Sequence, residues 1–156
     1  MQEGMQSKEK YFVLPNQSIT DIPKDVENIY FGGYGNEGDF TLLDFSSFGF
    51  TQLQSIAIGS HCFKNVCEFV LDGLEKLESV KIGEECFKVS NGVCRITNCP
   101  NLTQLEIGEE SFEDFKQFEL SNVNSLQSIQ FGYKCFRYAE NCILKGEWEE
   151  WMIMMF

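Results

Sequence analysis

The stretch that decides the fold is Leu53-Gln-Ser-Ile56-Ala-Ile58-Gly59-Ser-His-Cys62-Phe63, because the chain repeats it three more times. The later copies begin at Leu77, Leu102 and Leu126, so the steps along the chain are 24, 25 and 24 residues. Fixed periods of 20 to 50 residues are typical of proteins that stack one small unit on the next. The repeat therefore predicts a solenoid.

Each copy opens with a short strand. Ile56 and Ile58 alternate with polar or small residues, as the half-buried strand of a sheet requires. The other copies hold apolar residues at the same two positions, namely Val80 and Ile82, Leu105 and Ile107, and Ile129 and Phe131. The glycine that follows in every copy predicts a turn, because glycine accepts backbone conformations that other residues avoid.

The second half of each unit repeats as well. It aligns on Leu71, Ile96, Leu120 and Leu144, and two residues earlier it carries Phe69, Cys94, Phe118 and Cys142. Two residues later only glycine and asparagine occur, at Gly73, Asn98, Asn122 and Gly146. Apolar residues at a spacing of two predict a second short strand, and glycine or asparagine after it predicts a tight turn with positive φ. The fold class is a β-rich solenoid whose coils of about 24 residues each hold two short strands and little helix.

The pattern L-x-x-L-x-I-x-x-x-x-F resembles the leucine-rich repeat, and Ile-Gly-x-x-Cys-Phe is similar to the IGxxAF element of BspA-like bacterial and protozoan repeats. The resemblance covers about residues 26–144 and implies a leucine-rich-repeat-like solenoid. For some relatives it also implies a structural or adhesive role at the cell surface. Two features depart from the named classes. The ninth position of the phrase holds His61, Glu85, Glu110 and Lys134 in place of an asparagine ladder, and the proline that often follows a BspA-like strand is missing.

The ends of the chain break the pattern and define three regions. Residues 1–25 form an N-terminal lead and cap, in which apolar residues at 11–14 and 19–22 are expected to cover the end of the stack. Residues 26–150 form the repeat array of about five coils, and the first coil is irregular because 33–39 reads as an insertion. Residues 151–156 match the start of a further, truncated coil. Their apolar edge is expected to promote self-association.

Composition narrows the class of protein. Hydrophobic residues make up 43% of the 156, which is typical of a globular chain. The net charge of -12, from 24 acidic and 12 basic residues, argues against nucleic acid as a partner because phosphate binding depends on Lys and Arg. No secretory signal or membrane-spanning run is expected, so membrane insertion is not predicted. The predicted location is cytoplasmic, or the cell surface if the true N-terminus is missing.

The cysteines and the histidine predict no catalytic, cofactor or metal site. The seven cysteines include no C-x-x-C pair, and six of them share repeat positions with small or apolar residues. Cys62, Cys86 and Cys135 align with Ser111, for example. Only Cys67 falls at a position that tolerates polar residues. His61 precedes Cys62, but residues next to each other on a strand point to opposite faces, so no base and nucleophile pair is predicted and the chain is not expected to be an enzyme.

Two surfaces are candidate binding sites. The first is an acidic ridge, which stacked coils would form from Glu84, Glu85, Glu109 and Glu110. Such a ridge would suit a partner with a basic patch or a cation such as calcium; the alternative is a solvated turn. The second is the outward face of the first strands, whose residues differ from coil to coil: Gln54, Ala57, Glu78, Lys81, Thr103, Glu106, Gln127 and Gln130.

These observations favour a protein-binding or scaffold module, because stacked coils present an extended surface with side chains that vary coil by coil. The alternative is a structural or cell-surface adhesion element. The expected ligand is a protein partner.

Overall fold

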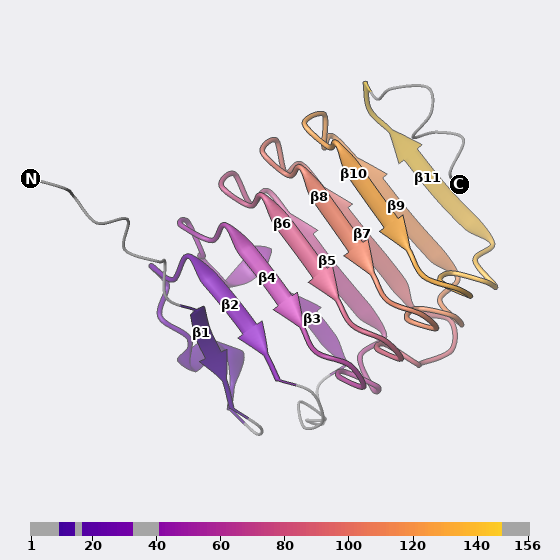
Figure 1. Ribbon diagram of the computed structural model, residues 1–156, viewed down its shortest axis with the longest axis horizontal. Helices are drawn as coiled ribbons and strands as arrows, with labels where there is room; N and C mark the ends of the chain where they lie inside the picture. The colour runs from indigo at the N-terminus through magenta and orange to yellow at the C-terminus, as the bar shows by residue number, and fades with distance from the viewer. Residues whose placement is uncertain (1–9, 15–16, 33–40, 148–156) are drawn as a thin grey trace, which may run out of the picture.

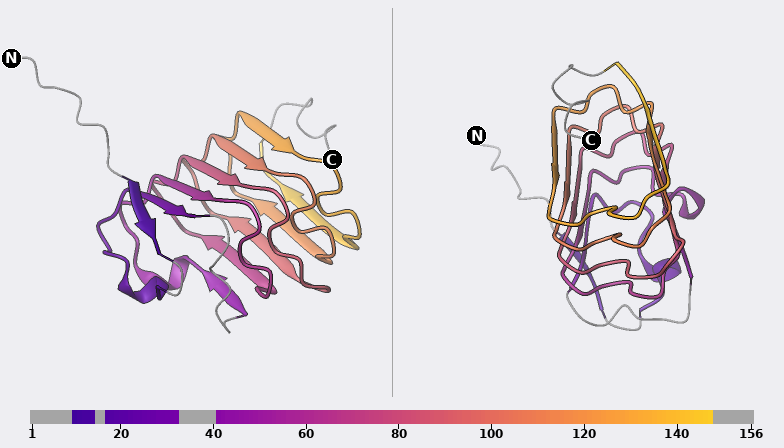
Figure 2. Two further views of the ribbon diagram at one scale, coloured as in Figure 1. Left: turned by 60° about the horizontal axis from the view of Figure 1, so that its bottom comes forward. Right: turned by 90° about the vertical axis from the view of Figure 1, so that its right-hand side faces the viewer.

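The fold is a β-solenoid of about five turns, as the computed structural model shows over residues 10–14, 17–32 and 41–147 (Figure 1). The β-rich solenoid predicted from the repeat is confirmed, with turns roughly 24 residues apart and almost no helix. Viewed from the end, each coil has two long sides that are joined by turns (Figure 2). Each long side belongs to one parallel sheet.

Sheet A holds the first strand of each coil and has the order β1-β2-β4-β6-β8-β10. Its strands are Lys10–Val13 (β1), Asn28–Phe31 (β2), Ser55–Ile58 (β4), Ser79–Ile82 (β6), Gln104–Ile107 (β8) and Ser128–Phe131 (β10). Sheet B has the order β11-β9-β7-β5-β3. Its strands are Leu42–Asp44 (β3), Glu68–Asp72 (β5), Val93–Thr97 (β7), Gln117–Ser121 (β9) and Asn141–Lys145 (β11). Two short 3-10 helices complete the described elements, Ile19–Asp21 (η1) and Ser46–Phe48 (η2).

The strand register follows the repeat. Leu71, Ile96, Leu120 and Leu144 are aligned across β5, β7, β9 and β11, as the second half of the unit predicts. Ile56, Val80, Leu105 and Ile129 are aligned across sheet A in the same way. This register keeps each inward position above its equivalent in the next coil, so one continuous core fills the space between the sheets.

Phenylalanine rings form the centre of that core. The ring of Phe112 stacks on Phe87 with centroids 4.4 Å apart and on Phe136 at 5.1 Å, nearly parallel in both cases. Phe63, Phe87 and Phe112 are buried, whereas Phe136 is partly exposed. Each fully buried side chain of this size contributes about 1.5–3 kcal/mol through the hydrophobic effect.

A turn follows the glycine that comes after each of β4, β6, β8 and β10, as predicted, but the positive φ values of that turn lie two residues beyond the glycine, at His61, Glu85, Glu110 and Lys134. The glycine is required by close stacking instead. A Cβ atom on Gly108 would lie 2.6 Å from the carbonyl carbon of Gly83 in the coil before it.

The stacked phenylalanines also have positive φ, between 52° and 58° at Phe63, Phe87, Phe112 and Phe136. This conformation is unfavourable for a bulky residue. The surrounding structure compensates for it, because the Phe112 N–H donates to the Cys86 carbonyl at 3.1 Å while the ring stacks in the core.

The N-terminal residues extend the stack. Residues 10–13 form β1, which pairs in parallel with β2 and adds an outer strand to sheet A. Ile19 and Ile22, from the segment expected to act as a cap, are buried against the core. The predicted insertion at 33–39 and the truncated coil at 151–156 lie outside the described residues.

Candidate protein-binding surface

The outward side of sheet A carries a straight row of side chains, one from each strand. Strand register places Phe12, Tyr30, Ala57, Lys81, Glu106 and Gln130 next to one another in that order. We call these six residues the central row. Neighbouring strands of a sheet lie about 4.8 Å apart, so the row presents six different side chains at regular intervals along the solenoid.

The other sequence-predicted surface residues stack beside this row. Gln54, Glu78, Thr103 and Gln127 directly precede the sheet A strands of their coils, and backbone hydrogen bonds join each to the next. The Glu78 N–H, for example, donates to the Gln54 carbonyl at 2.7 Å. The structure therefore arranges all eight predicted residues in two parallel rows along sheet A.

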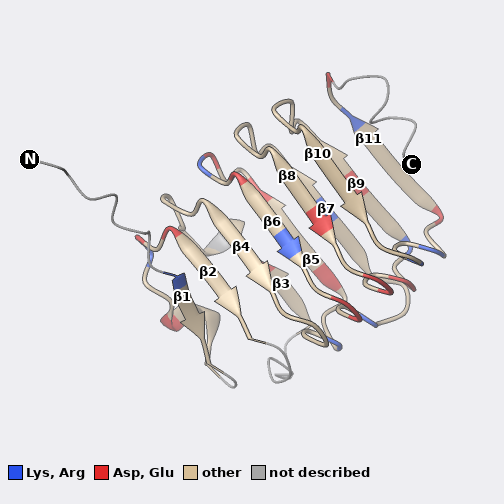
Figure 3. Cartoon of the chain, in the orientation of Figure 1, with Lys and Arg blue, Asp and Glu red and all other residues tan. Residues whose placement is uncertain are grey.

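Lys81 and Glu106 are the only charged residues in the strands from β2 to β10 of sheet A (Figure 3). They occupy neighbouring rungs. Lys81 is exposed and Glu106 is half-buried, and among the described residues neither makes an ion pair.

Several charges elsewhere on the solenoid are paired between neighbouring coils. On sheet B, Arg95 lies between Glu68 at 3.6 Å and Glu119 at 3.7 Å. At the turns, further pairs join one coil to the next: His61–Glu85, Lys88–Glu110, Lys88–Glu113, Lys134–Glu110, Arg137–Glu113 and Lys116–Glu140. These pairs lie off the central row, so among the described residues the outward strand positions of sheet B include ion-paired charges and those of sheet A do not.

The residues of the predicted acidic ridge fall into two kinds. Glu85 contacts the imidazole of His61 at 3.5 Å, and Glu110 lies between Lys88 and Lys134 at 3.7 and 3.5 Å. Glu84 and Glu109 are exposed. Glu110 thus already has two cationic neighbours from adjacent coils, and Glu85 has an imidazole beside it.

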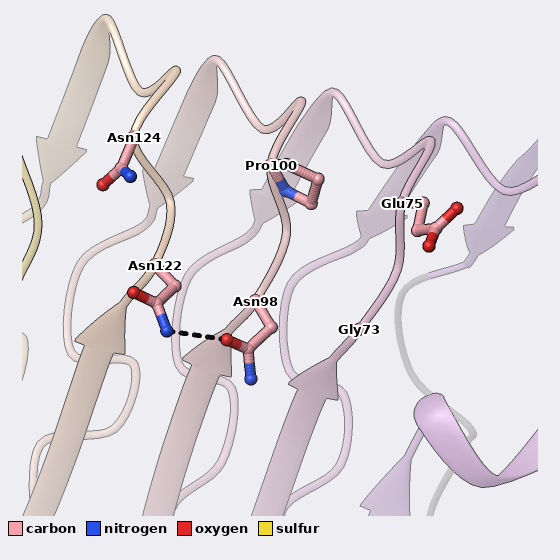
Figure 4. Close-up of a pocket in the computed structure, with 6 residues that line it drawn as sticks. All are labelled: Gly73, Glu75, Asn98, Pro100, Asn122 and Asn124. Atoms are coloured by element: carbon pink, nitrogen blue, oxygen red, sulfur yellow. Dashed lines mark hydrogen bonds between the residues drawn. The ribbon is translucent and has the colours of Figure 1, made fainter.

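An open hollow of about 470 Å³ lies where the sheet B strands end, lined by Gly73, Glu75, Asn98, Pro100, Asn122 and Asn124 (Figure 4). Its side-chain amides bond to one another along the solenoid. Asn122 Nδ2 donates to Asn98 Oδ1 at 2.8 Å, and Asn98 Nδ2 donates to Asp72 Oδ1 at 2.8 Å. Gly73, Asn98 and Asn122 take positive φ, as predicted for this turn. These side-chain hydrogen bonds hold the turns of neighbouring coils together, and this structural role accounts for the polar lining of the hollow without a ligand.

Three of the seven thiols make hydrogen bonds between neighbouring coils. All seven cysteines are free, and Cys62, Cys86 and Cys135 donate to glycine carbonyls of the preceding coil at 3.0 to 3.1 Å. Cys142, which was expected to be buried, is exposed because it lies on the last described strand of sheet B. Within the described part of the chain, no three side chains of His, Cys, Asp and Glu gather to hold a metal ion.

Sequence reasoning missed part of this surface. Phe12 and Tyr30 extend the central row at its N-terminal end, but they lie outside the four clean repeats. The signal that could have found Tyr30 is its place between Ile29 and Phe31, which point inward. A second outward row was also missed, formed by Asn28, Ser55, Ser79, Gln104 and Ser128.

The fold and surface define a β-solenoid with an exposed sheet face. No protein family, characterised protein or solved structure matches the chain significantly. Within the described residues, no helix is long and apolar enough to span a bilayer.

Proposed function

We propose that this chain is a protein-binding or scaffold module that docks its partner on the outward face of sheet A. The observation that carries the proposal is the contrast in charge pairing. Lys81 and Glu106 have no ion-pair partner within the described residues, whereas Arg95 on sheet B has two. Unpaired charges on a regular face are available to complementary charges of a partner, which set specificity and association rate.

The chemistry of the face supports a protein partner over a nucleic acid. The central row combines aromatic side chains, which are enriched in protein interfaces, with charged and amide side chains of the kind found at the polar rim of an interface. A phosphate backbone would require a cluster of Lys and Arg, but Lys81 is accompanied by Glu78 and Glu106. The partner therefore presents both signs of charge.

The proposal includes the class of repeat. We infer a leucine-rich-repeat-like module similar to BspA-like repeats, acting in the cytoplasm. The repeated phrase supports this inference, since its Ile-Gly-x-x-Cys-Phe element, complete from Ile58 and from Ile82 and varied by one residue in the next two copies, forms the end of a sheet A strand and the turn after it. A role in adhesion would instead require the protein at the cell surface, which fractionation of producing cells distinguishes.

Site-specific photo-crosslinking tests the proposal. A photoreactive amino acid is introduced at Ala57 or Gln130 of sheet A, and at Val70 or Gln117 of sheet B as matched controls. In cells that make the protein, we expect one protein adduct from the sheet A positions and none from the controls. The purified partner should then bind the Lys81→Glu variant about tenfold more weakly, as expected for loss of a charge contact. Adducts that form only from sheet B, or an affinity that Lys81→Glu leaves unchanged, would contradict the proposal.

A further inference from the structure

Large apolar side chains are exposed at the N-terminal end of the sheet A face. Phe12 is 62% exposed and Leu14, directly after β1, is 65% exposed. The ring of Phe12 meets Tyr30 on the next strand in an edge-to-face contact, with centroids 5.5 Å apart. Apolar side chains grouped on a surface are typical of interaction sites, whereas single ones are common on any protein.

We propose that Phe12 and Tyr30 are the anchor of the protein-binding surface and take an apolar side chain of a protein partner, while Lys81 and Glu106 pair with an acidic and a basic group of the same partner. This inference rests on the proposed function, because it places the anchor on the face that the function uses.

The order of the central row supports this arrangement. Ala57 lies between Tyr30 and Lys81 and is the smallest side chain of the row. A large apolar side chain of the partner that lies across the Phe12 and Tyr30 rings would extend over Ala57 toward the methylene groups of Lys81. Aromatic residues near such contacts contribute most of the binding energy in protein interfaces, and charges around them set orientation.

The charges identify the occupant as a protein. Lys81 and Glu106 lie on neighbouring rungs without an ion pair between them, so a matching surface must bring an acid and a base about 5 Å apart. Protein side chains supply such a pair. An anionic lipid surface does not, because it attracts clusters of basic residues and would repel Glu78 and Glu106.

Sheet B provides an internal comparison. Ile143 on β11 is 41% exposed, but its neighbour on the adjacent strand is Glu119, which forms an ion pair with Arg95. Ile143 is therefore a matched control for Phe12: an exposed apolar side chain in a strand of the other sheet.

Selection from a library of random 12-residue peptides displayed on phage tests the inference with the full-length chain as bait. The binding of the enriched peptides is then measured for four variants: Phe12→Gln, Phe12→Tyr, Lys81→Glu and Ile143→Gln. We expect peptides that carry a large apolar residue. Phe12→Gln should weaken their binding at least about tenfold, the loss typical of truncating an anchor residue. Phe12→Tyr and Ile143→Gln should change it less than about threefold, while Lys81→Glu should weaken peptides that contain an acidic residue.

The outcomes separate this inference from the proposed function. Peptides weakened by Lys81→Glu but not by Phe12→Gln would overturn the anchor and retain sheet A as the docking face. Peptides that neither variant affects, or the absence of any enriched peptide, would overturn both. Circular dichroism shows whether each variant is folded, and the exposure of Phe12 predicts that Phe12→Gln leaves the fold intact.

Discussion

Cys86 and Ser111 occupy the same position in adjacent coils, and the Cys86 N–H donates to Ser111 Oγ at 3.0 Å. Ser111 Oγ in turn donates to the Gly83 carbonyl at 2.7 Å. Cys86 Sγ repeats the second contact one coil earlier, donating to the Gly59 carbonyl at 3.1 Å. A side-chain donor at this position therefore ties each coil to the one before it.

Ser111→Ala should lower the free energy of unfolding by about 1–3 kcal/mol, because it leaves the buried Cys86 N–H and the Gly83 carbonyl without these hydrogen bonds. Ser111→Cys keeps a donor and should lose less than about 1 kcal/mol. Urea denaturation measures both. If Ser111→Ala were as stable as the parent, the donor would have no part in coil stacking.

Asn98→Val should destabilise the chain by about 1–2 kcal/mol, because a β-branched residue is strained at the φ of 53° that this position adopts. Asn98→Gly is the control. It also loses the amide contacts to Asp72 and Asn122 but accepts positive φ without strain. Thermal denaturation should rank parent, Gly and Val in falling stability; equal losses in the two variants would assign the whole effect to the amide contacts.

Burial raises the pKa of the Cys99 thiol from its ordinary value of 9.0 to about 11. The neutral thiol is thus favoured in the folded state, so its contribution to stability is complete below pH 9 and is lost between pH 9 and 11. Cys99→Val removes this ionisation and matches the Leu74 and Val123 of equivalent coils.

The Cys99→Val variant should be within about 1 kcal/mol of the parent at pH 7. From pH 9 to 11 it should lose up to about 1.4 kcal/mol less per pH unit than the parent. Urea denaturation at pH 7, 9, 10 and 11 provides the comparison. If the free energy of unfolding fell equally in the two proteins from pH 9 to 11, ionisation of Cys99 would not be the cause of the loss of stability at alkaline pH.

Glu110→Gln should lower stability by about 0.5 kcal/mol at low salt, because Glu110 contacts both Lys88 and Lys134. The loss should fade in 0.5 M salt as screening grows. Glu109→Gln should instead be neutral or slightly stabilising, since the Glu109 side chain is exposed and the chain is acidic overall. Melting temperatures at two salt concentrations test this. Equal effects of the two variants would show that the lysine contacts of Glu110 do not matter and that the four carboxylates act alike as one acidic ridge.

Residues 151–156 lie outside the described residues, and their self-association stays a prediction from the apolar sequence Trp151 to Phe156. Deleting 151–156, or replacing Met152 and Ile153 with Lys, should reduce self-association and improve solubility while the earlier coils stay folded. Sedimentation velocity at several concentrations measures the effect. A full-length chain that stays monomeric in the tens of micromolar range would refute the prediction.

The repeat was sufficient to predict two strands per coil and their register. Ile56, Val80, Leu105 and Ile129 recur at steps of 24, 25 and 24 residues, and this spacing can bury all four side chains together only if the coils stack in parallel. The same periodicity located the turns at Asn98 and Asn122. It also placed Ala57, Lys81, Glu106 and Gln130 on one outward face, because side chains alternate along a strand.

Contacts between coils depend on distances in space, which periodicity does not encode. The close approach of Gly108 to Gly83, the positive φ of Phe112 and the donor role of Cys86 became visible only when neighbouring coils were placed against each other. Which carboxylates are paired depends in the same way on the reach of lysine side chains across coils. Periodicity thus decided the architecture, because burial repeats with it. Tertiary structure decided which surface charges remain unpaired, because pairing requires two side chains from different coils to come within about 4 Å of each other.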